Sequence, residues 1–191
     1  MKYPDMFMPH IILTKDVYLK KALSVILEQV SPARKLCIVD IESYKSLGAI
    51  VRLLKRNKLT ERHHLIFIGG RDVSSRVLEP LVTIYRKSCF MTFRKQLVDG
   101  RTHSPENTLK YIARCRSLSM LTVQEKRTLF ALLDTGDTWA AARKIYLSPK
   151  TVYTYTNNIG QKLNLRSILQ VRQFIFTEFV LDAKTGAEVT H

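Results

Sequence analysis

The stretch LSPKTVYTYTNNIGQKL, residues 147–163, decides how the C-terminal part of the chain folds. Ser148 followed by Pro149 is a helix start, because a serine hydroxyl caps the first turn and proline fits the first helical position. The apolar side chains that follow fall on one helical stripe, which comprises Val152, Ile159 and Leu163. The segment therefore predicts a helix from Lys150 to Leu163 with one apolar and one polar face.

Two further helices are predicted just upstream. Thr122 and Glu125 have the spacing of a capping box, in which each side chain satisfies a backbone N–H group at a helix start. The helix that follows ends at Gly136, a residue suited to the left-handed conformation at a helix C-terminus. Thr138 can cap a short second helix from Trp139 to Tyr146, and a tight turn leads into the helix described above. Three helices in this order are typical of a helix-turn-helix.

The polar face of the third helix has the chemistry of a base-reading surface. A helix fits the DNA major groove with its N-terminal half against the base edges. Asn pairs with adenine, Thr contacts a thymine methyl group and Tyr offers a hydroxyl or a stacking face. The polar side chains that project from the helix are those of Tyr153, Thr154, Asn157 and Asn158. Those expected near phosphates are Lys150, Thr151, Tyr155 and Lys162.

The alternative is that this polar face only coats a solvated helix. Asn and β-branched Thr are poor helix formers, yet three Thr and two Asn lie between residues 150 and 163. They lower helix propensity without a gain in stability, which favours a binding role.

The spacing of these features resembles the helix-turn-helix of LuxR/FixJ-type (NarL-like) transcription regulators. The resemblance runs from residue 121 to residue 167 and rests on LTxxE at 121–125, LSxxTV at 147–152 and IxxKLxLxS at 159–167. It implies that Tyr153, Thr154 and Asn157 face bases. The phosphate-facing or supporting positions are then Lys150, Thr151, Tyr155, Asn158 and Lys162.

The sequence departs from this family pattern at two places. Gly136 falls one residue later than the usual glycine, and the usual Ile-Ala of the second helix reads Ala141-Ala142. The smaller side chains thin the core there, and we expect Trp139 to fill the space.

A last helix opened by Ser167 carries more apolar surface than three small helices can bury. In the resembled family this helix forms the dimer contact, which implies a homodimer that matches paired half-sites. The predicted dimerisation residues are Ile168, Leu169, Val171, Phe174 and Ile175. The alternatives are that the helix packs on its own chain, or that it pairs with another LuxR-type regulator.

Composition narrows the function classes. With 31 Lys and Arg against 16 Asp and Glu, the net charge is +15, which attracts polyanions such as double-stranded DNA; a solubility surface is the alternative. No apolar run is long enough for a membrane span, and the scattered basic residues disfavour a membrane partner. Cys37, Cys89 and Cys115 form no disulfide or zinc pattern and are expected to be reduced core thiols of a cytoplasmic protein. No catalytic motif occurs, so we expect neither an enzyme nor a cofactor or metal.

The first hundred residues have a different pattern. Short apolar runs alternate with helical stretches, which predicts a parallel sheet covered on both faces. The four predicted strands are residues 10–13, 36–39, 65–68 and 82–85. This layout resembles a response-regulator receiver, but only residues 30–35 separate the first helix from the second strand, where a complete receiver has another strand and helix, roughly twenty residues more.

The phosphorylation site of a receiver is also incomplete. Thr14 and Lys15 stand where the family has an acidic pair, with Asp16 one place late, while Asp40 ends a strand and Lys87 follows the last one. We expect regulation without phosphorylation, as in the small enterobacterial regulators of acid-resistance and fimbrial genes, which this degenerate, shortened receiver resembles. The alternative is a true response regulator that uses Asp40 as its phosphoacceptor.

The sequence thus predicts an α/β domain followed by an all-helical one. The expected boundaries are residues 8–101 for the receiver-like domain, 102–118 for a linker helix, 119–181 for the helix-turn-helix domain and 182–191 for a flexible tail. The predicted function is that of a sequence-specific DNA-binding transcription regulator, such as an activator, that acts as a dimer and contacts RNA polymerase. An auxiliary regulator that works mainly by heterodimerisation is the alternative.

Overall fold

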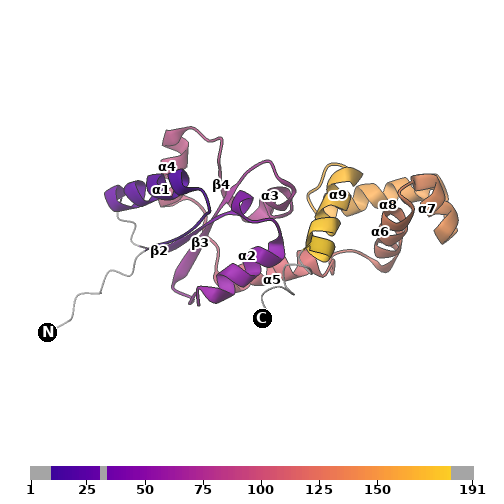
Figure 1. Ribbon diagram of the computed structural model, residues 1–191, viewed down its shortest axis with the longest axis horizontal. Coiled ribbons are helices and arrows are strands. Elements are labelled where there is room, and N and C mark those ends of the chain that lie inside the picture. The colour runs from indigo at the N-terminus through magenta and orange to yellow at the C-terminus, as the bar shows by residue number, and fades with distance from the viewer. Residues whose placement is uncertain (1–9, 31–33, 182–191) are drawn as a thin grey trace.

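A computed structural model describes residues 10–30 and 34–181 of the chain, so the expected tail at residues 182–191 lies outside the described residues. An α/β unit and a helical unit follow one another along the long axis of the molecule (Figure 1). Together they confirm the predicted fold class.

The α/β unit is built on a four-stranded parallel sheet in the order β1-β2-β3-β4, as predicted. The strands are β1 (Ile11–Leu13), β2 (Lys35–Asp40), β3 (His63–Gly69) and β4 (Val82–Tyr85). The helices are α1 (Val17–Val30), α2 (Leu47–Arg56), α3 (Val73–Val77) and α4 (Phe90–Asp99), with 3-10 turns η1 (Ile41–Ser43) and η2 (Glu79–Leu81). Because α1 leads to β2, the neighbour of β1, the sheet lacks the second strand–helix unit of a receiver.

Helices cover both faces of this sheet, which explains why its strands are apolar without alternation. On one face Leu23 of α1 and Leu97 of α4 pack against Ile66 of β3. On the other face Ile50 of α2 packs in one core with Phe67 of β3. The sequence analysis names no helix after β4, so α4 is an addition.

The expected linker helix is α5 (Pro105–Arg116), capped by Ser104. It is a packed layer rather than a free connection, since Ile112 and Cys115 are fully buried. Just before it, His103 exchanges two backbone hydrogen bonds with Leu65 of β3, at 2.8 and 2.9 Å. Cys37 and Cys115 are buried thiols as expected, but the expectation is wrong for Cys89, which is exposed.

The helical unit contains α6 (Val123–Thr135), α7 (Thr138–Ile145), α8 (Pro149–Lys162), α9 (Ile168–Ile175) and the π-helical segment η3 (Phe176–Leu181). The capping box is confirmed, because Thr122 accepts from the Glu125 N–H and Glu125 accepts from the Thr122 N–H. Gly136 ends α6 in the left-handed region at φ 72°, also as predicted.

Two details of α7 differ from the prediction. Asp137, not Thr138, caps this helix, with its carboxylate accepting from the Ala140 N–H at 2.8 Å. Trp139 does not fill the core, because 68% of its surface is exposed. Instead, Ala141 and Ala142 allow α7 to approach α6 closely, so no large side chain is needed there.

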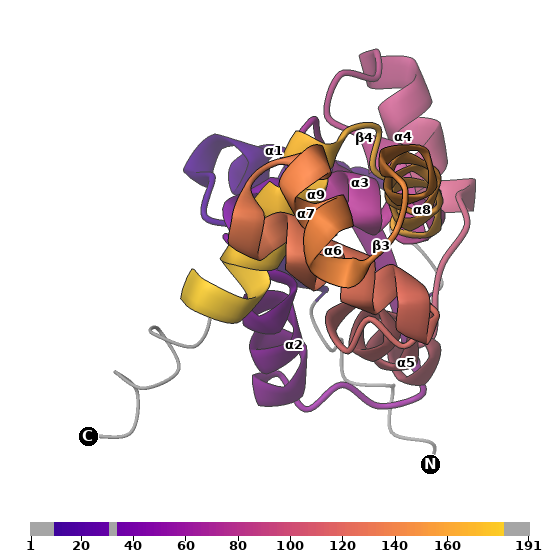
Figure 2. The ribbon, with the colours of Figure 1, turned by 90° about the vertical axis from the view of Figure 1, so that its right-hand side faces the viewer.

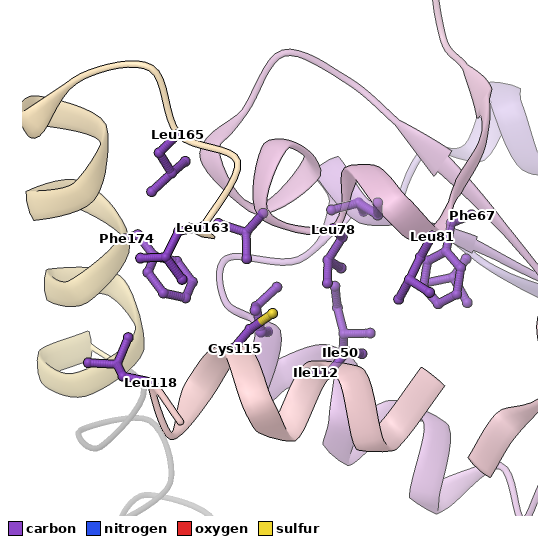
Figure 3. Close-up of a cluster of buried hydrophobic side chains, with 14 of the residues drawn as sticks. Ile50, Phe67, Leu78, Leu81, Ile112, Cys115, Leu118, Leu163, Leu165 and Phe174 are labelled. Carbon is purple, nitrogen blue, oxygen red and sulfur yellow. The ribbon is translucent and has the colours of Figure 1, made fainter. Parts of the chain in front are cut away.

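One hydrophobic core joins the two units. Leu163, Leu165 and Phe174 of the helical unit lie beside Cys115 and Leu118 at the end of α5, and the same cluster continues to Phe67 of the sheet (Figure 3). The helix-turn-helix is therefore packed on the α/β unit rather than tethered to it.

Candidate nucleic-acid interface

The orientation of α8 is fixed at its start and along one side. The Ser148 hydroxyl accepts from the Thr151 N–H at 3.1 Å, and Pro149 occupies the first turn. Along the helix the predicted stripe of Val152, Ile159 and Leu163 is fully buried. Figure 2 views α8 almost end-on, with α6 and α7 on one side of it. The opposite, polar side is consequently held outward.

The side chains predicted to face bases lie on this outward side. Tyr153 is 64% exposed, and Thr154 and Asn157 are exposed as well. The Thr154 hydroxyl donates to the Lys150 carbonyl oxygen at 3.1 Å, which turns its methyl group outward to where a thymine methyl can be met. The α/β unit leaves this face open, because these exposures hold with the whole described chain in place.

The predicted phosphate contacts are arranged around the same face. Lys150 is exposed in the first turn, whereas Thr151, Tyr155 and Asn158 are half-buried along the edges of α8. The Thr151 hydroxyl lies 2.7 Å from that of Ser148, so it also belongs to the cap. These groups surround a helix N-terminus, where unpaired N–H groups favour phosphate.

Lys162 has a role that the sequence analysis missed. Its ammonium group donates to Glu125 Oε2 at 2.8 Å, which ties the end of α8 to the capping box of α6. Burial opposes ionisation of Glu125, but the hydrogen bonds from Lys162 and Thr122 outweigh it and lower the pKa of this carboxyl. Lys162 therefore positions α8, and a contact with phosphate has to compete with this ion pair.

Sequence reasoning also missed Gln161. This residue is exposed on α8 one turn after Asn157, and its amide can donate and accept as that of Asn157 does. The signal was the spacing of four residues, which places two side chains on one helix face.

The predicted dimer surface on α9 is largely occupied by the chain itself. Val171, Phe174 and Ile175 are buried in the core shared with the α/β unit, and Ile168 is half-buried. Only Leu169 is exposed, at 71% of its surface. As the chain is folded here, the prediction is wrong for the three buried residues, because the sequence could not show that a second unit covers them.

The pocket at the ends of β1 and β2 differs from a phosphorylation site. Asp40 is almost completely buried, and the guanidinium of Arg86 donates to both of its oxygens, at 3.1 and 2.6 Å. Thr14 Oγ1 donates to Asp40 Oδ2 at 2.7 Å, and Ser43 donates to the same oxygen. Lys87, predicted to face the pocket, is exposed, so the neighbouring Arg86 takes that position.

Arg86 also gathers the other acidic groups of this pocket. Its guanidinium lies 3.5 Å from Asp16 and 3.2 Å from Glu42. The hydrogen bond to Asp40 is the main reason that the pKa of Arg86 is raised, so the cation is permanent. Within the described residues, no group of His, Cys, Asp or Glu is arranged to hold a metal ion. A guanidinium thus stands at the centre of these carboxylates.

Comparisons with known proteins agree with this geometry. Residues 119–175 match the family described as bacterial regulatory proteins, luxR family, so the helical unit contains a LuxR-type helix-turn-helix domain. No curated protein matches the chain. In the parts of the chain that the structure describes, no helix is both long and apolar enough to span a bilayer.

Solved structures of RcsB have the same fold. RcsB dimers bound to two parallel DNAs are 15% identical with a TM-score of 0.58, over 88% of this chain and 97% of the RcsB chain. RcsB from Salmonella enterica serovar Typhimurium, bound to a promoter in the presence of phosphomimetic BeF3-, is 12% identical with a TM-score of 0.57, over 87% and 97%. At such identities the likeness shows the receiver-like and helix-turn-helix fold alone.

Proposed function

We propose that the chain is a transcription regulator that reads double-stranded DNA with α8 and acts without phosphorylation of Asp40. The observation that carries this proposal is the open polar face of α8, with Tyr153, Thr154 and Asn157 outward on a helix whose other side is locked into a LuxR-type domain. The net charge of +15 supplies the attraction to a polyanion.

Affinity and specificity come from different parts of this face. Lys150 and the free N–H groups at the start of α8 approach phosphates, which sets the register of the helix in the groove. Asn157 then pairs with an adenine edge, while Tyr153 and Thr154 contact neighbouring bases. Each good base contact contributes about 1–3 kcal/mol of discrimination against the wrong base.

Independence from phosphorylation is supported by the Asp40 pocket. Both oxygens of Asp40 already accept hydrogen bonds from Arg86, and Arg86 occupies the centre of the acidic groups. A phosphoryl donor would have to displace this cation before it could reach the carboxylate. DNA binding of Asp40→Asn is expected to equal that of the wild type, with and without acetyl phosphate. Wild-type binding that acetyl phosphate stimulates, with the stimulation lost in Asp40→Asn, would overturn this part of the proposal.

Dimerisation on DNA is part of the same proposal. Beside Leu169, Phe176 and Phe179 of η3 are exposed, so an apolar edge remains on the last helical segment. Two copies that pair there would present two α8 helices to paired half-sites. A related LuxR-type chain could use the same edge, and equilibrium sedimentation of the chain on its operator distinguishes one copy from two.

The test is a titration of an operator, obtained by selection from random DNA, followed by fluorescence anisotropy over a range of salt concentrations. Asn157→Ala is expected to weaken operator binding by about 1–3 kcal/mol, with little effect on random DNA. Lys150→Ala is expected to weaken both DNAs alike and to lower the salt slope by about one. Lys20→Ala, an exposed lysine on α1, is the matched control. Wild-type binding by both α8 variants would refute the assignment.

A further inference from the structure

The last segment of the chain returns to the α/β unit through one buried carboxylate. Glu178 of η3 is only 4% exposed and lies at the N-terminus of α2. It accepts hydrogen bonds from the backbone N–H groups of Leu47 and Gly48, and from Arg116 Nε at 3.1 Å. The first N–H groups of a helix have no partner within the helix, and the positive end of the helix favours an anion. Glu178 therefore joins η3 to α2 and to the end of α5.

Apolar and polar contacts extend this junction along α9. Phe174 lies beside Cys115 and Leu118 in the core that joins the two units (Figure 3). At the start of the loop into α9, the Asn164 side chain donates to the Val77 carbonyl oxygen at 3.5 Å. The whole segment from α8 to η3 is thus docked on α2, α3 and α5.

This docking treats the two functional faces of the helical unit differently. The base-reading face of α8 stays open, whereas Val171, Phe174 and Ile175 are withdrawn from any second copy. Leu169, Phe176 and Phe179 are the large apolar side chains of α9 and η3 that remain exposed. A pair of copies that met only through this edge would leave most of the apolar surface of α9 unused.

We propose that the docking of α9 and η3 on the α/β unit is an intramolecular lock held by Glu178, and that a second copy of this chain displaces it when two helix-turn-helix units pair on DNA. The inference rests on the proposed function. The lock competes with dimerisation for the same apolar side chains, so weakening it increases pairing and tightens binding to a site with two half-sites. A purely structural role for Glu178 would weaken both.

Variants of Glu178 in the full chain test the lock. Glu178→Ala leaves the N–H groups of Leu47 and Gly48 without an acceptor, and Glu178→Lys places a cation against Arg116 and the positive end of α2. Both variants are expected to lose hydrogen-exchange protection at Leu47 and Gly48 by about tenfold, in line with the loss of one buried hydrogen bond. Sedimentation is expected to show more dimer. Glu178→Gln, which keeps an acceptor oxygen, is the matched control and should stay docked.

A measurement on the wild type decides the matter if the variants do not fold. On the selected operator, the wild-type chain is expected to bind as a dimer and to lose protection at the Leu47 and Gly48 amides. A DNA-bound dimer that keeps this protection overturns the lock, as do folded Ala and Lys variants that stay monomeric. Absence of sequence-dependent DNA binding by the wild type would instead refute the proposed function.

Discussion

Removal of Arg86 gives a direct measure of the charge balance in the Asp40 pocket. Arg86→Ala would leave the carboxylate of Asp40, which is 1% exposed, with hydrogen bonds from Thr14 and Ser43 but no cation. Asp16 and Glu42, both now held at the guanidinium, would add repulsion. The pocket would contain a buried, uncompensated negative charge.

The magnitude follows from burial. Removing one partner of a buried ion pair costs about 3–5 kcal/mol. Arg86 is 29% exposed, so water screens part of its interaction, and two hydroxyl donors remain on Asp40. We therefore expect the low end, about 3 kcal/mol, as a decrease in the free energy of unfolding. Lys87→Ala changes the adjacent, exposed lysine and is expected to cost less than about 0.5 kcal/mol.

The assay is urea unfolding at pH 7, followed by circular dichroism, for the wild type, both single variants and the Asp40→Asn, Arg86→Ala double variant. Because Asp40→Asn removes the charge that Arg86 compensates, the double variant should be more stable than Arg86→Ala alone. A loss in Arg86→Ala no larger than in Lys87→Ala would refute the reasoning. So would a double variant no more stable than Arg86→Ala.

Three further predictions concern the shared core, the capping box and Glu178. Phe174→Ala should cost about 3–5 kcal/mol, because this side chain is 2% exposed, and probes in both units should report one transition; separate transitions would contradict a common core. Thr122→Ala should lower the unfolding free energy by about 0.5–2 kcal/mol through loss of the α6 cap, and an unchanged value in urea unfolding would count against it. Burial raises the pKa of Glu178 above its ordinary 4.5, although Leu47, Gly48 and Arg116 oppose the shift. Since the folded chain then holds the proton more tightly than the unfolded one, the wild type should lose stability relative to Glu178→Gln as the pH rises above 4.5, and a pH-independent difference in melting curves would contradict this.

The helix-turn-helix could be predicted because its signals are local. The capping box of Thr122 and Glu125, the glycine at position 136 and the Ser148-Pro149 start each act within one turn of the helix that they begin or end. The outward face of α8 followed from helical periodicity alone. Likewise, the apolar strands of the sheet could be read directly, since both faces of each strand are buried.

The features that escaped prediction depend on contacts distant in sequence. Periodicity marked Phe174 as apolar, but it could not tell a partner copy from the end of α5 as the surface that covers it. In the same way, Lys162 is committed to Glu125, 37 residues earlier. Arg86 rather than Lys87 reaches Asp40 because successive residues at the end of a strand point to opposite sides.

The claim that α8 enters the major groove is tested most directly by photocrosslinking. Iodouracil placed at each thymine of the selected operator puts a reactive iodine where the thymine methyl group faces the major groove. We expect the full chain to crosslink at Tyr153, identified by mass spectrometry of the peptide that spans α8. Crosslinks confined to aromatic residues of the α/β unit, such as the exposed Tyr18 or Phe90, would contradict the assignment of α8 as the reading helix.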